Sequence, residues 1–296
     1  MSLKGYTQKL IIPGFDGLSL YEVSLFFYKG LLEGSLTTRA SSLAFNFFLA
    51  FFPSIIVLFT LIPFVPIEGF QEQLFVLMMD ILPPSTFDAT KSILDDIVNN
   101  EQGGLLSFTF VLALYFSTNG VNAMITGFNA TYHLTDKRTW WQLRLLSFTL
   151  TLVLAILLVL TIIFQLFSQG FLSNLVSEGY LHQYSADIIL YVKWLILVLV
   201  LFISYSILYY YGPADKNGWK FLSAGSISTT ILSVTSSLGF SYYVTNFAQY
   251  NQLYGSIGTL LVILLWMYFN SIILLLGFEL NASIVSAKEK QQNKFD

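Results

Sequence analysis

The chain has 296 residues, of which 55% are hydrophobic and only 10% charged, and its mean hydropathy is +0.68. An average soluble domain carries about 25% charged residues, so this composition excludes an ordinary soluble enzyme. The net charge of −3 gives no general attraction for nucleic acid, and the lack of cysteine excludes disulfides and thiolate metal sites.

Six stretches are apolar over the roughly 20 residues that a helix needs to cross a bilayer. They cover about 40–66, 105–128, 143–167, 188–211, 221–247 and 255–285. The fifth is the weakest, because it is rich in Ser and Thr. No stretch alternates in polarity as the strands of membrane barrels do. The sequence therefore predicts an all-α polytopic protein with a single integral membrane domain over 1–296.

The distribution of basic residues predicts the orientation of these spans. If the N-terminus is cytoplasmic, 12 of the 14 Lys and Arg side chains fall on the cytoplasmic side. Such an excess is typical of the inner side of a membrane. We expect both termini inside, with 1–39 cytoplasmic or interfacial and 286–296 as a cytoplasmic tail.

Residues 18–34 ahead of the first span have the pattern of an amphipathic helix. Leu20, Val23, Phe27 and Leu31 share one face at 100° per residue. Such a helix either lies in the inner membrane interface or packs on the cytoplasmic end of the bundle. The pattern does not decide between these two placements.

The longest external connection, residues 68–104, is expected to form short surface helices. Pro83 and Pro84 interrupt it, and Ser85 with Asp88 forms a capping box for a second short helix. The segment is too short for a separate domain.

A search for catalytic motifs is negative. The phosphate-binding GxxxxGK[ST] motif, GxSxG and HExxH are all absent. His133 and His182 fall on opposite predicted sides of the membrane, and the pair Asp95-Asp96 is typical of a solvated helix face. We therefore predict no enzymatic activity, no metal and no cofactor.

Polar side chains at membrane depth are the more informative feature, because they are costly there and usually face the bundle interior or water. The predicted topology places most of them in the cytoplasmic half. The candidates for a cavity or substrate path are Arg39, Asn46, Asn119, Asn122, Asn129, Tyr205, Thr230, Asn270 and Glu279. Arg39 and Glu279 fall at the inner boundary, at similar depth, close enough to pair.

Two interpretations of these polar residues stay open. They line a hydrated cavity open to the cytoplasm, or they form dry contacts between helices worth about 0.6 kcal/mol each. Packing is favoured for the serine stripe of the fifth span. For the asparagines of the first, second and sixth spans, the cavity and the packing interpretations are equally supported. Arg39 is equally well explained as a charge that only sets topology.

Several motifs resemble the YihY/BrkB family of bacterial inner-membrane proteins. The most specific are GFSYYVTNFAQYNQLYGSIG from Gly239 to Gly258, Leu264-Leu-Trp266, and LGFELNA from Leu276 to Ala282. The first helix from Ala44 to Pro53 and the second from Ser117 to Gly120 with Asn129 are also similar, although Asn46 replaces the usual aromatic residue. The resemblance implies six membrane helices in a bacterial cytoplasmic membrane.

The family has carried the label ribonuclease BN, and transport or lipid handling is its usual suggested role. This chain has no basic groove, no metal-ligand cluster and no soluble domain to hold RNA. We therefore expect a transporter-like or lipid-handling protein with a cytoplasm-facing polar cavity. The expected partners are membrane lipids and a small amphiphilic or anionic substrate, with no nucleic acid, and a homo-oligomer is compatible with the sequence. The alternative is a non-catalytic scaffold whose polar stripes are packing contacts.

Overall fold

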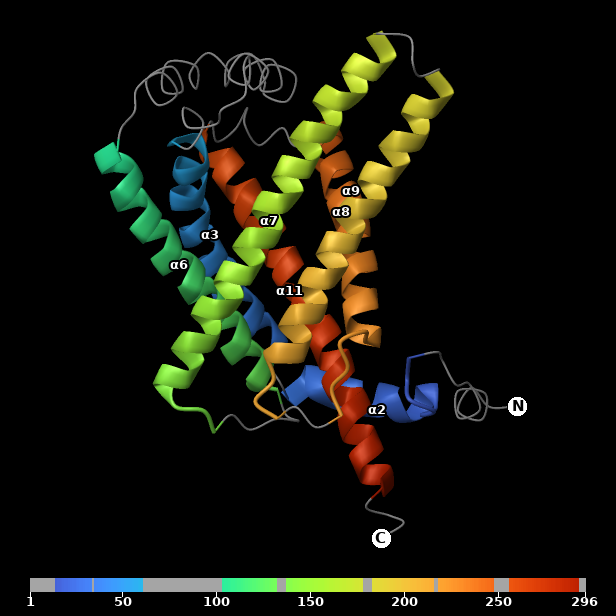
Figure 1. Cartoon of the computed structure of the whole chain (residues 1–296). Helices are drawn as coiled ribbons and strands as arrows, with labels where there is room; N and C mark the ends of the chain where they lie inside the picture. Colours follow the sequence, from blue (N-terminus) through green and yellow to red (C-terminus); the bar gives the residue numbers. More distant parts are fainter. Residues whose placement is uncertain are drawn as a thin grey trace. The chain divides into compact units, whose positions relative to one another are not determined.

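The structure, a computed structural model, describes residues 14–33, 35–60, 103–131, 137–177, 183–215, 218–247 and 256–292. Every regular element in these ranges is a helix (Figure 1). The seven helices are α2 (Leu20–Glu33), α3 (Leu36–Thr60), α6 (Gly103–Asn129), α7 (Trp140–Ser177), α8 (Gln183–Tyr211), α9 (Ala224–Phe247) and α11 (Ser256–Gln292). The all-α prediction is confirmed for this part of the chain. The expected external segment 68–104 lies almost wholly outside it.

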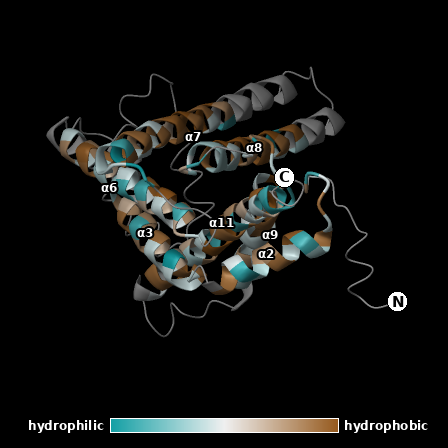
Figure 2. Ribbon diagram, turned by 90° about the horizontal axis from the view of Figure 1, so that it is seen from below, coloured by the Kyte–Doolittle hydropathy of each residue, from teal (hydrophilic) through white to brown (hydrophobic). Residues whose placement is uncertain are grey.

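Four of these helices are long and apolar enough to cross a membrane. Their apolar stretches are Ser107–Asn129, Trp140–Gln165, Tyr191–Tyr211 and Leu260–Gln292. They coincide with the second, third, fourth and sixth predicted spans. In Figure 2 the middle part of α7 is coloured mostly as hydrophobic.

The helices α3 and α9 form at the positions of the first and fifth predicted spans. Within the described residues neither belongs to the four apolar candidates. For α9 the physical reason is its Ser and Thr content, and much of that polarity faces protein: Ser226, Thr229 and Ser233 are all buried. The count of six spans and the cytoplasmic termini stay predictions.

The chain divides into two compact units, residues 46–120 and the remainder. In the smaller unit, α3 and α6 approach closely at Gly120, where an added Cβ would lie 3.2 Å from the Phe47 ring. In the larger unit α11 packs on both α9 and α2, α9 also packs on α8, and α8 packs on α7.

The helix α2 lies against the C-terminal part of α11 (Figure 1). Val23 is buried in a cluster with Leu18, Ala224 and Ile284. The apolar face predicted from the sequence therefore packs on the bundle at Val23, and the placement of α2 in the membrane interface stays a prediction. A second apolar stripe, Leu25, Tyr28 and Leu32, is exposed on the opposite side. The two apolar faces explain why periodicity alone could not place this helix.

An ionic contact joins the segment before α2 to two other parts of the larger unit. The Asp16 carboxylate accepts hydrogen bonds from Lys220 at 2.6 Å and from Lys288 at 3.2 Å. Burial alone would raise the pKa of Asp16, but the two ammonium groups outweigh it and hold the pKa below its usual value. Asp16 is therefore ionised at neutral pH and links the start of the chain to α11 and to the segment preceding α9.

Candidate functional site

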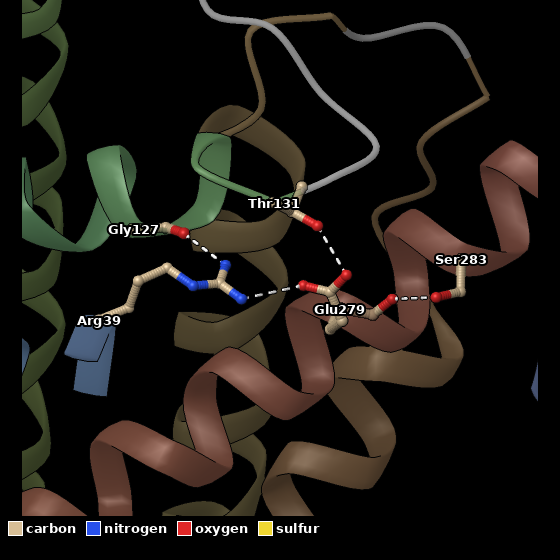
Figure 3. A network of polar contacts seen from close by, with 5 residues as sticks. All are labelled: Arg39, Gly127, Thr131, Glu279 and Ser283. Carbon is tan, nitrogen blue, oxygen red and sulfur yellow. Dashed lines mark hydrogen bonds and ion pairs between the residues drawn. The ribbon is translucent and has the colours of Figure 1, made fainter. Parts of the chain in front are cut away.

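The feature that stands out in the larger unit is a buried ion pair between the first turns of α3 and the second half of α11. Arg39 Nη2 lies 3.4 Å from Glu279 Oε2, and the two side chains are 8% and 0% exposed. Arg39 Nη1 also donates to the Gly127 carbonyl at 2.9 Å. Figure 3 shows the guanidinium between that carbonyl and the carboxylate. The pairing expected from the matching depths of Arg39 and Glu279 is present.

Local structure explains the position of each partner. Gly127 lies in the last turn of α6, where carbonyls lack an intrahelical partner and the helix dipole favours a cation. Thr131, just beyond α6, donates to Glu279 Oε1 at 2.6 Å. Ser283 donates to the Glu279 backbone carbonyl one turn further along α11 (Figure 3). Three helices thus converge on one pair of charges.

The donor capacity of Arg39 is incompletely used. A guanidinium has five N–H donors in a planar fork. Arg39 Nε is buried and has no hydrogen-bond partner among the described residues. The 3.4 Å separation between Nη2 and Oε2 is longer than the about 2.7–2.9 Å of a strong charge-assisted bond. The pair is therefore buried but loosely joined.

Asn129, a predicted site residue, joins the end of α6 to the end of α8. Its Nδ2 donates to the Gly212 carbonyl at 3.0 Å, and its Oδ1 accepts from the Ala214 N–H at 2.8 Å. Arg138 donates to the same Gly212 carbonyl. These contacts satisfy backbone groups that α8 leaves unpaired at its C-terminus.

Asn281 makes similar hydrogen bonds at the other end of the α8–α9 connection. Its Oδ1 accepts from the Gly225 N–H at 2.7 Å, and its Nδ2 donates to Ser223 Oγ at 2.9 Å. Orphan donors at the start of α9 are satisfied in this way. Both asparagines therefore serve as helix caps supplied by a neighbouring helix.

Tyr205, another predicted site residue, forms a hydrogen bond with Ser233 at 2.9 Å. One turn away, the Tyr209 hydroxyl contacts Thr229 and donates to the Leu274 carbonyl at 2.6 Å. Both contacts connect α8 to the helices packed beside it. The predicted site residue Thr230 donates to a carbonyl of its own helix.

The remaining predicted asparagines are half-buried. Asn122 accepts from Ser147 of α7 at 3.3 Å, and Asn270 donates to the Trp266 carbonyl of its own helix. Asn46 and Asn119 belong to the smaller unit. The single water-filled space predicted for these four asparagines stays a prediction.

The residue pattern did not identify Thr131 or the Gly127 carbonyl as partners of the ion pair. Thr131 lies outside any helix, so no periodicity could identify it, and a backbone carbonyl leaves no trace in the residue pattern. Among the described residues no group of three or more His, Asp or Glu could hold a metal ion.

An all-α polytopic membrane protein with a buried ion pair is the class that these observations define. The sequence model of the family described as virulence factor BrkB matches residues 27–296, and the chain belongs to that family. It is 31% identical over 270 residues to a protein of Bacillus subtilis (strain 168) named as ribonuclease-like, YfkH, covering 90% of this chain and 95% of the relative.

Two further relatives are named only as membrane proteins. A UPF0761 membrane protein of Vibrio campbellii is 28% identical, with 93% of this chain and 84% of the relative covered. One from Coxiella burnetii (strain Dugway 5J108-111) is 24% identical, covering 85% and 89%. No solved structure matches the chain. The family is thus a membrane-protein family.

Proposed function

We propose that this protein is a transporter-like or lipid-handling protein of the bacterial cytoplasmic membrane, with both termini inside and the Arg39–Glu279 pair as its ligand site. The observation that carries the proposal is the burial of both charges. Ionisable residues buried among membrane helices are costly, and they commonly mark substrate or ion pathways. The pair is also the point where α3, α6 and α11 meet.

The chemistry of Arg39 favours an anionic headgroup as the ligand. Its planar fork matches a phosphate or carboxylate, and its Nε–H has no partner among the described residues. In the free protein the Glu279 carboxylate occupies the position that such an anion would take. Because Glu279 also accepts from Thr131, it keeps one partner when an incoming anion takes over the guanidinium. Glu279 therefore acts as an internal competitor.

The second candidate function is a membrane scaffold, and specific contacts favour it. Asn129 and Asn281 satisfy backbone groups of neighbouring segments, and the Tyr209 hydroxyl is bonded within the bundle. In this interpretation the ion pair is one more helix contact and binds no ligand.

The two functions differ in what the substitution Glu279→Gln should do. Removing the negative charge weakens the competitor, so the affinity for phosphatidylglycerol should rise about tenfold, equivalent to about 1.4 kcal/mol. Arg39→Lys keeps the charge but loses the fork, and it should weaken binding. Native mass spectrometry of detergent-solubilised protein, titrated with phosphatidylglycerol, measures both. A Glu279→Gln variant that binds no more tightly than the wild type would leave the scaffold as the better account.

A further inference from the structure

A second ligand-sized feature of the larger unit is a groove of about 510 Å³ between α3, α9 and α11. Ala44 and Phe45 form its wall on α3, Tyr243 its wall on α9, and Leu261 and Leu265 its wall on α11. Binding sites for small molecules occupy about 300–1,000 Å³ and are mostly apolar with a few polar groups. The groove has that size.

The residues that line the groove indicate which kind of ligand it can bind. Among the described residues no charged side chain lines the groove, and the polar side-chain groups there are the hydroxyls of Ser41, Tyr243 and Tyr268. The Ser41 hydroxyl already donates to a carbonyl of its own helix. A phosphate or a cation would therefore find no counter-charge among these residues, whereas a hydrocarbon chain matches the mostly apolar surface.

The place of the groove in the fold identifies the source of such a chain. Leu261 and Leu265 belong to the apolar stretch of α11 that is able to cross a membrane, and they are 46% and 40% exposed. In a bilayer the medium at such positions is lipid. We propose that the groove binds one acyl chain of a membrane phospholipid, entering from the side.

The groove goes beyond the ligand site proposed above, because it lies on another side of α3. At about 100° per residue, Ala44 and Phe45 are about 140° and 240° around the helix from Arg39. Lipid tails are as apolar as leucine, so a bound chain gains nothing from hydrophobic transfer. Its retention comes from packing between two tyrosines and fixed helix walls, which bulk lipid does not offer.

A groove-filling substitution tests this proposal. Leu265→Trp places a bulky ring in the groove, whereas Leu260→Trp is the matched control, since Leu260 has nearly the same exposure, 39%, on the same helix but does not line the groove. The probe is phosphatidylcholine with a nitroxide near the end of one chain, reconstituted with each protein. Electron paramagnetic resonance separates immobilised from mobile chains. Because this headgroup is zwitterionic, the assay does not depend on the anion site at Arg39.

Chains in contact with the outer surface of the bundle are immobilised in every variant, so we expect a larger immobilised component per protein for the wild type and for Leu260→Trp than for Leu265→Trp. Leu261→Trp fills the same groove from one turn away and provides a second variant if the first does not fold. Folding is checked by the thermal unfolding temperature. If a folded groove-filling variant immobilises as much lipid as the wild type, the groove does not hold a chain. Either result leaves the phosphatidylglycerol experiment on Glu279 unaffected.

Discussion

The two halves of α11 differ sharply, although they belong to one continuous helix. In the first half Leu261, Leu265 and Phe269 are between 40% and 46% exposed. In the second half Leu275 and Phe278 are 1% and 0% exposed. The more uniformly apolar half is the exposed one.

The small and polar residues of the second half account for this difference. Gly277 lies against Gly225 and Thr229 of α9, and Asn281 bonds to the start of that helix. In a membrane, apolar side chains gain little by leaving lipid, whereas small residues allow close backbone approach and polar ones bond across helices. In α11 the buried half is therefore the one whose small and polar residues allow close contact with α9.

The strongest test of this comparison is to remove one charge from the buried half. Glu279→Leu leaves the Arg39 guanidinium buried without its counter-charge, which should destabilise the protein by about 3–5 kcal/mol. Thermal unfolding in detergent measures the loss. The double variant Arg39→Met with Glu279→Leu should recover much of it. If the single and double variants are equally unstable, the ion pair is not the source of the effect.

A pair of glycines tests the role of close approach. In Gly277→Ala the new Cβ would collide with Thr229 and lie 2.9 Å from the Gly225 carbonyl, so we expect a destabilisation of about 1–3 kcal/mol. The matched change Gly239→Ala in α9 meets nothing within 4 Å. It should stabilise that helix by about 0.5–1 kcal/mol. Unfolding temperatures that move in the same direction for both variants would contradict our explanation of the buried half.

The smallest expected effect concerns the end of the buried half, where Lys288 meets Asp16. Asp16→Asn should cost about 0.2–1 kcal/mol, because both lysines are well exposed. Since the pKa of Asp16 is lowered in the folded protein, its contribution is complete above the ordinary value of about 3.9 and is lost as the pH falls below it. The difference in unfolding temperature between the wild type and Asp16→Asn should therefore be present at pH 7 and shrink below about pH 4. A difference that is the same at both pH values would assign the effect to packing.

The positions of the long helices could be predicted because apolar length is a local property. The predicted span 143–167 falls within Trp140–Ser177, for example. The contact of Arg39 with Glu279 was also within reach, because charges are scarce in the spans and orientation places these two at one depth. The hydrogen bond from Asn129 to the Gly212 carbonyl could not be predicted, because Gly212 is 83 residues away and carries no side chain.

The distance along the chain between Arg39 and Glu279, 240 residues, has a consequence for biogenesis. Arg39 is synthesised with α3, whereas its counter-charge follows with α11, the last helix described. Until Glu279 has been synthesised, Arg39 lacks this partner. The contact between α3 and α11 at this pair can therefore form only after nearly the whole chain has been synthesised.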